Sequence, residues 1–254
     1  MNRRMLLLSL CGIAGVAGLG AAWGSRKGPT SPPLYEGTLE ALRIRDRSAS
    51  DRAVSRLFRR KRKATIGALV KAMDHPEDLV RVRAARAISM HHAAKDVSGD
   101  MARHLLTNPS EGARVSCAIG LMSVYTPAVR EAYIRALDDK ADRVVRMACG
   151  EVAYRGGAGA AEALSRKLDH PSWRVRLEVC KGLIVLKAAD GRVVKTLEDM
   201  SKDPEAAVYD AEIDEFNRID QEVAREMGPL PEEAKGWGKI GEILAQARQV
   251  ASKK

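Results

Sequence analysis

An internal repeat constrains the fold of this chain more than any other feature. Similar segments begin at five anchor positions, 74, 107, 139, 169 and 202, so the steps between them are 33, 32, 30 and 33 residues. Two segments start with Asp-His-Pro, at Asp74 and Asp169, and both carry Val-Arg six and seven residues after the aspartate. Self-similarity at a nearly fixed period of this length is typical of repeat proteins whose units pack on their neighbours.

Each unit is predicted to contain two helices joined by a tight turn. Apolar residues recur at helical spacing before each anchor, which predicts first helices at 65–73, 101–106, 127–137, 160–168 and 192–200. Prolines are expected in the first turn of the second helix, at positions 76, 109, 171 and 204. Only 4% of the residues are aromatic, and the small aliphatic side chains suit stacked helices better than strands. The sequence therefore predicts an all-α fold.

The turn aspartate and the Val-Arg of the second helix resemble HEAT repeats, particularly the short bacterial form also seen in phycobilisome-lyase-like proteins. The pairs that carry the resemblance are Asp74/Arg81, Asp139/Arg146 and Asp169/Arg176. The second unit departs from the pattern with Thr107 beside Arg114, and the fifth has Tyr209 in place of arginine. The resemblance covers residues 64–226 and implies a right-handed α-solenoid of about five HEAT-like helix pairs, but it is almost uninformative about activity.

In that family, such aspartates and arginines form a ladder between stacked units. The resemblance therefore implies a structural ladder made by Asp74, Arg81, Arg114, Asp139, Arg146, Asp169 and Arg176. On this hypothesis, replacing Arg146 with alanine lowers the melting temperature.

Helical caps are expected on both sides of the repeats, because solenoids need polar ends for solubility. A basic N-terminal cap is predicted over residues 38–63, with a capping-box-like helix start at Ser48-Ala-Ser-Asp51. At the other end, residues 227–254 are predicted to form a linker and a capping helix, which extends over about residues 232–251 and folds back on the final repeat.

The N-terminus has the pattern of a membrane-directed segment. Arg3 and Arg4 precede residues 5–25, which carry no charge and are long enough to cross a bilayer as a helix. A secretory signal cleaved after Ala22 fits equally well, and a buried core helix is a third alternative. Residues 1–25 are thus expected to be a signal peptide or transmembrane anchor, followed by a Pro/Ser/Gly-rich linker at 26–37. The chain is expected to be anchored by a single span or exported to the periplasm or extracellular space.

Charge is distributed unevenly along the chain, whose formal net charge is +10. Residues 40–63 hold ten Lys/Arg against three acids, while residues 198–235 hold thirteen acids against four Lys/Arg. The basic stretch provides the candidate electrostatic binding residues Arg52, Arg56, Arg59, Arg60, Lys61, Arg62 and Lys63. Such a cluster suits phosphates, anionic lipid or an acidic protein, and a merely solvated helix face is the alternative.

No catalytic, cofactor-binding or metal-binding residues are predicted. The chain lacks a phosphate-binding Gly-x-x-x-x-Gly-Lys loop and the His-Glu pairs of HEAT-like deoxyhypusine hydroxylases. HEAT-like alkylpurine DNA glycosylases use aromatic residues in a cleft, whereas Trp173, the one tryptophan in these repeats, is expected to be exposed at a turn. Cys117, Cys149 and Cys180 fall in apolar helices without metal-ligand spacing, so we expect them to be small core residues.

These features together favour a non-enzymatic scaffold or adaptor. A solenoid offers a long curved surface suited to a protein partner, including an acidic one. Residues 5–25 would contact the membrane if they are not cleaved. Nucleic-acid or anionic-surface binding through residues 52–63 is the first alternative, and a lyase-like accessory role in handling a cofactor is the second.

Overall fold

The computed structural model describes residues 34–214 and 238–253, and all regular secondary structure in these residues is helical. The predicted all-α class is confirmed for this part of the chain. The predicted signal or anchor at 1–25 lies outside the described residues, as does the linker up to residue 33. None of the described helices has both the length and the apolar content that a membrane crossing requires.

The helices follow one another with short connections. They are α1 (Leu34–Arg43), α2 (Arg47–Ala72), α3 (Asp78–Met90), the short 3-10 helix η2 (Ala94–Val97), α4 (Ser98–Thr107), α5 (Glu111–Leu121), α6 (Pro127–Ala136), α7 (Asp142–Arg155), α8 (Ala160–Ser165), α9 (Trp173–Val185), α10 (Gly191–Met200) and α12 (Ile240–Ala251). Residues 204–214 are also helical.

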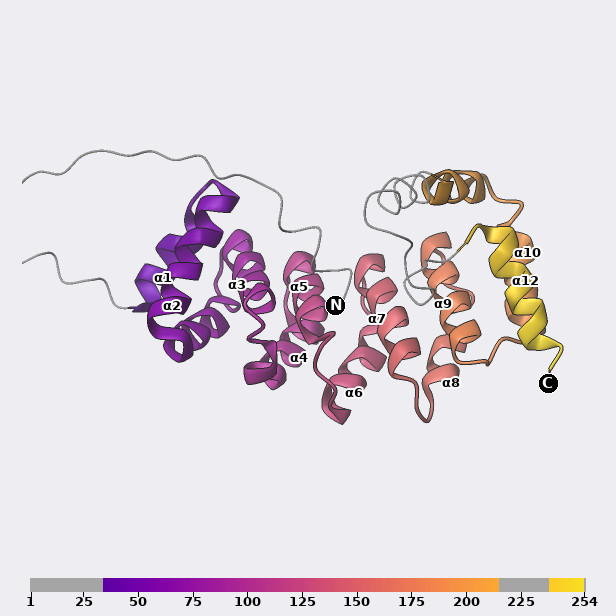
Figure 1. Cartoon of the computed structure of the whole chain (residues 1–254), viewed down its shortest axis with the longest axis horizontal. Coiled ribbons are helices and arrows are strands. Elements are labelled where there is room, and N and C mark those ends of the chain that lie inside the picture. The colour runs from indigo at the N-terminus through magenta and orange to yellow at the C-terminus, as the bar shows by residue number, and fades with distance from the viewer. Residues whose placement is uncertain (1–33, 215–237, 254) are drawn as a thin grey trace, which may run out of the picture.

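Helices α3, α5, α7 and α9 stand side by side in one row, and each packs against the next (Figure 1). Helices α2, α4, α6 and α8 each pack against the row helix that follows them in the sequence. We call α3, α5, α7 and α9 the second-helix row. Close packing at these contacts requires small residues, since a Cβ on Gly120 would lie 2.8 Å from Met101 Cε and one on Gly182 2.8 Å from Leu164 Cδ1.

At the N-terminal end, the first helix begins earlier than predicted, and the second helix has a different N-cap residue. Helix α1 starts at Leu34, so the last four residues of the predicted linker 26–37 are helical. The cap of α2 is Asp46, whose carboxylate accepts the Ala49 N–H at 2.7 Å, rather than the expected capping box at Ser48. Helix α2 then runs through the expected boundary at residue 63 with a kink at Lys61, whose φ and ψ are −147° and 61°.

The prolines also differ in position from the prediction. Pro76, Pro109 and Pro171 precede the N-cap residues of α3, α5 and α9 and therefore stand two positions before the first helical residue. Only Pro204 begins its helix as expected. The fixed φ of these three prolines shapes the turn itself and leaves their carbonyl groups free to accept hydrogen bonds from side chains.

The C-terminal end covers the last helix of the row. Helix α12 packs against α9 and α10, at the place where a capping helix was expected. The prediction that Trp173 is exposed is wrong, because its ring is buried 5.9 Å from the ring of Tyr209 in the helical segment 204–214. Helical spacing alone could not show that this later segment covers the start of α9.

Candidate functional site

A repeated arginine stabilises three of the turns that precede the row helices. Arg81 donates from Nη1 to the backbone oxygens of His75 and Pro76, both at 2.7 Å. Arg114 makes the corresponding two bonds at 2.8 and 3.3 Å, and Arg176 makes both at 2.9 Å. These arginines therefore satisfy carbonyl groups that the turn leaves outside the helical ladder.

Five turns, the four before the row helices and the one before residues 204–214, are closed in the same way, by a side chain that accepts the backbone N–H of the residue two positions later. The accepting residue, which we call the turn residue, is His75, Asn108, Asp139, His170 or Asp203, at distances of 2.8–3.1 Å. Proline follows the turn residue in four turns, whereas Lys140 follows Asp139. The third turn therefore keeps the closing bond without the proline.

The third turn is shifted by one residue relative to the repeated arginine. Arg81, Arg114 and Arg176 lie six residues after their turn residue, but Arg146 lies seven after Asp139. One residue turns an α-helix by about 100°, so Arg146 points away from the turn carbonyls. The buried Val145 takes the position of the arginine in the other units. Accordingly, no hydrogen bond or ion pair joins the Arg146 side chain to another residue in the described part of the chain.

The aspartates of the expected ladder lie in unlike environments. Asp139 forms a two-pronged ion pair with Arg114 of the preceding unit, with Nε–Oδ2 at 2.7 Å and Nη2–Oδ1 at 2.8 Å. Only 3% of the Arg114 side chain and 7% of the Asp139 side chain is exposed. Asp74 is 62% exposed beside Arg103 at 3.5 Å. Asp169 is 89% exposed and pairs with Arg192 at 3.1 Å. Within residues 34–214 and 238–253, Arg114–Asp139 is the one ion pair between a repeated arginine and the next turn.

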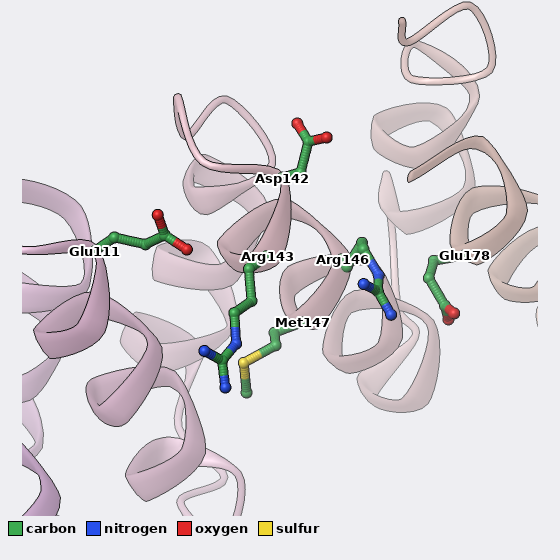
Figure 2. Close-up of a pocket in the computed structure, with 6 residues that line it drawn as sticks. All are labelled: Glu111, Asp142, Arg143, Arg146, Met147 and Glu178. Carbon is green, nitrogen blue, oxygen red and sulfur yellow. The ribbon is translucent and has the colours of Figure 1, made fainter. Parts of the chain in front are cut away.

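Arg146 lies in an open hollow of about 640 Å³ at the start of α7. Figure 2 shows Arg143, Arg146 and Met147 extending from α7 on one side and Glu178 on the next helix, α9. The remaining lining residues are Glu111 and Asp142. The Nε atom of Arg146 is shielded from solvent and has no hydrogen-bond acceptor among the described residues. The Nε atoms of Arg81 and Arg155 are shielded in the same way, so what distinguishes Arg146 is that its two Nη groups also make no hydrogen bond to a described residue.

Two acids that lie beyond α7 are already paired. Glu212 of the helical segment 204–214 binds Arg174 at 2.8 Å, and this hydrogen bond, followed by the charges of Arg174 and Arg146, lowers the pKa of Glu212. Glu178 Oε1 accepts a hydrogen bond from the Lys181 ammonium at 3.2 Å. Burial lowers the pKa of Lys181, and its ammonium group also lies 5.0 Å from the ring centre of Tyr209. Glu178 thus stabilises a buried cation on its own helix. The other charged side chains of the hollow, Arg143, Arg146, Glu111 and Asp142, form no ion pair with a described residue.

Two exposed tyrosines lie near the C-terminal ends of α5 and α7, whereas the hollow lies at the start of α7. Tyr125 follows α5 and Tyr154 lies in the last turn of α7, with ring centres 6.3 Å apart and exposed fractions of 65% and 69%. The hydrogen bond with Tyr154 raises the pKa of Tyr125. Arg155 lies 4.9 Å from the ring of Tyr125 and donates to the Leu121 and Val124 carbonyls, so the pair is held on a rigid base.

The predicted basic cluster on α2 is exposed at all seven positions. Arg62 pairs with Asp96 at 3.2 Å, and for the other six cations no ion pair to a described residue exists. The kink at Lys61 divides the group, so that Arg62 and Lys63 border a separate hollow of about 540 Å³. The structure therefore brings together the four arginines before the kink, Arg52, Arg56, Arg59 and Arg60.

Sequence reasoning did not single out Arg143, Met147, Glu178 or the two tyrosines. The sequence does contain a signal for the hollow. The arginine lies seven residues after the turn residue in the third unit and six in the other units, and Lys140 stands where the other turns have proline. The cysteines are buried as predicted, and burial raises the pKa of Cys117, Cys149 and Cys180 to about 12. In the described ranges, no three His, Cys, Asp or Glu side chains converge as metal ligands would.

Comparison with known proteins assigns no family. No protein-family model matches the chain, and no curated protein matches it. A crystal structure described as an engineered protein from the Northeast Structural Genomics Consortium is similar over 86% of this chain and 97% of that chain, at 15% identity and a TM-score of 0.41. A TM-score of this size does not establish a shared fold.

Proposed function

We propose that this chain is a non-enzymatic scaffold that binds a protein partner along the second-helix row of a HEAT-like α-solenoid. The successive contacts α3–α5, α5–α7 and α7–α9 support the solenoid, because each unit packs on the next. The uncharged residues 5–25 support attachment to a membrane or export, as a second part of the proposal.

The observation that carries the proposal is the unpaired Arg146. Its counterparts Arg81, Arg114 and Arg176 stabilise their own turns, whereas the guanidinium of Arg146 stands in a hollow and makes no hydrogen bond or ion pair to a described residue. Arginine is enriched at the centres of protein interfaces, where it forms two-pronged bonds with carboxylates. We therefore propose that the partner places a carboxylate against Arg146.

The tyrosine pair provides a second contact at the other end of α7. Arg146 and Tyr154 are eight residues apart, which corresponds to about 12 Å along the helix. Exposed tyrosines on a rigid base bury large area at low entropic cost when a partner binds. A partner segment with an acidic residue for Arg146 and an apolar surface for Tyr125 and Tyr154 fits both contacts.

Site-specific photo-crosslinking in cells that make the chain naturally would test this function. A crosslinking amino acid at Met147, beside Arg146, should give one defined protein adduct. The same amino acid at the exposed Arg135 of α6, outside the row, serves as the matched control. Replacing Arg146 with alanine should remove the Met147 adduct. Equal adducts from both positions, or a Met147 adduct that persists without Arg146, would contradict the proposal.

A further inference from the structure

Four arginines form one face of the first part of α2. Arg52, Arg56, Arg59 and Arg60 are spaced by four, three and one residues, which places them on one side of a helix. The opposite side is buried through Ser50, Val54 and Phe58. We call Arg52, Arg56, Arg59 and Arg60 the arginine face. It spans about 12 Å along the helix and is exposed over its whole length.

The arginine face is not neutralised within the described residues. Like charges at spacings of three and four residues destabilise a helix, here between positions 52, 56, 59 and 60. The nearest acid on the helix, Asp51, is held by Arg86 of α3 at 3.1 Å. The face therefore retains four unpaired charges that repel one another, and an anionic surface would relieve this repulsion.

We infer that the arginine face docks on an anionic lipid surface. Two observations favour lipid over single-stranded nucleic acid. Single-stranded nucleic acid binds with exposed aromatic residues as well as cations, but Phe58 is buried and stacked on His91 with ring centres 4.1 Å apart. In addition, only residues 26–33 separate the uncharged run 5–25 from α1, and eight residues span at most about 28 Å.

This inference rests on the membrane-attachment part of the proposed function, and not on the protein partner. A cationic helix next to a membrane-directed segment gains attraction to anionic headgroups that falls off within a Debye length. The arginine face would then fix which side of the α1–α2 end lies against the bilayer. The second-helix row would be oriented relative to the membrane by the same contact.

Co-sedimentation of the full chain with vesicles tests the inference. Binding to vesicles containing phosphatidylglycerol should exceed binding to neutral phosphatidylcholine vesicles, and the difference should shrink as salt is added. The variant Arg52→Gln/Arg56→Gln/Arg59→Gln/Arg60→Gln should lose this difference, by about fivefold for each arginine near the surface. Binding to neutral vesicles should not change, because it measures residues 5–25 alone.

A matched control removes four exposed positive charges elsewhere, in Arg135→Gln/Lys140→Gln/Arg166→Gln/Lys195→Gln. This control should keep most of the preference for phosphatidylglycerol. Replacing the four arginines of the face with lysine should also keep it, since lipid attraction depends on charge, and this variant guards against an effect of folding. Circular dichroism should be the same for all four proteins.

Two outcomes would overturn the inference. In one, the arginine-face glutamine variant and the matched control lose the same amount of binding to phosphatidylglycerol vesicles. In the other, a short RNA or DNA binds the wild-type chain at physiological salt, and the glutamine variant loses this binding while its vesicle binding is unaffected. Either result leaves the Met147 crosslinking test unchanged, so failure of the lipid contact and failure of the scaffold proposal are distinguishable.

Discussion

The turns before α5 and α7 are built from the same closing bond but use their arginines differently. Before α5, Arg114 lies six residues after Asn108, binds the turn carbonyls and joins Asp139 of the next unit. Before α7, Arg146 lies seven residues after Asp139 and enters an open hollow instead. A shift of one residue in the turn thus replaces an arginine that stabilises the turn with one whose side chain bonds to no described residue.

The comparison also shows how a repeat acquires a distinct surface without a new motif. Val145 occupies the buried position that arginine holds in the other units, and Arg146 occupies the position of Val115 and Leu177, which are both buried. The row helices nevertheless continue to pack on one another, α5 on α7 and α7 on α9. Only the side chains near the turn are rearranged.

The largest expected effect is the loss of stability when Arg114 is replaced. Replacing Arg114 with alanine leaves Asp139 buried without its ion pair and leaves the Asn108 and Pro109 carbonyls without a donor. Removing one partner of a buried ion pair costs about 3–5 kcal/mol. The midpoint of urea unfolding should therefore fall substantially. Adding Asp139→Asn should recover part of the loss, and additive effects of the two substitutions would contradict the pairing.

Exchanging two residues should move the third unit to the arrangement of the others. The double substitution Val145→Arg/Arg146→Val places arginine six residues after Asp139, within reach of the turn carbonyls, and an aliphatic residue where Val115 and Leu177 lie. We expect the Met147 crosslink to disappear. The free energy of unfolding should change by less than about 3 kcal/mol, which is the lower limit for breaking a buried ion pair.

The single substitution Val145→Arg is the control for this exchange, since it keeps Arg146 in the hollow. The crosslink should survive in this variant if the chain folds. Retention of the adduct in the double variant would show that Arg146 does not contact the partner.

Much of the fold followed from the sequence because the repeated signals are local. Apolar spacing located the paired helices, and prolines marked four of the five turns. The third turn has Lys140 in place of proline, so matching Asp139 with Asp74 gave an alignment that the structure shifts by one residue. The hydrogen bond from the Ala141 N–H to the Asp139 side chain decides this register. Sequence periodicity cannot resolve a shift of one residue.

The rest of the candidate site depends on contacts between units. Tyr125 and Tyr154 meet only because α5 and α7 pack side by side. The arginine face was within the predicted basic segment, but the kink at Lys61 that separates it from Lys63 is a tertiary feature. Such features arise from packing, which a single sequence pattern does not specify.

Acidic pH should weaken the turn before α5 through His104. This side chain is buried, shares a hydrogen bond with Asn108 at 3.1 Å and faces Arg103, Asp74 and Asp100. Burial, followed by the charge of Arg103, lowers its pKa below the ordinary value of about 6.5. The unfolded chain then binds more protons, so the free energy of unfolding should fall as pH decreases from about 6.5 through the folded pKa.

Urea unfolding measured across this range would detect the effect, with His104→Gln as the variant that reduces it. Burial also lowers the pKa of His91, so the variant should keep part of the pH dependence. Amide exchange should accelerate around Asn108 and not around Asp139, because Arg135 stands four residues before Asp139, where the other turn has His104. Equal acceleration at both turns would contradict a specific role of His104.

The smallest expected effect distinguishes the two arginines most directly. The ladder hypothesis from the sequence predicts that Arg146→Ala lowers the melting temperature, whereas the hollow predicts almost no change. Because Arg146 makes no hydrogen bond or ion pair to a described residue, its removal loses only side-chain packing, and it also removes the unfavourable burial of its unpartnered Nε. We therefore expect the free energy of unfolding to change by about 0.5 kcal/mol or less. Thermal unfolding of Arg146→Ala beside Arg114→Ala makes the comparison under one set of conditions. A loss from Arg146→Ala as large as that from Arg114→Ala would restore the ladder and remove the reason to place a partner's carboxylate in the hollow.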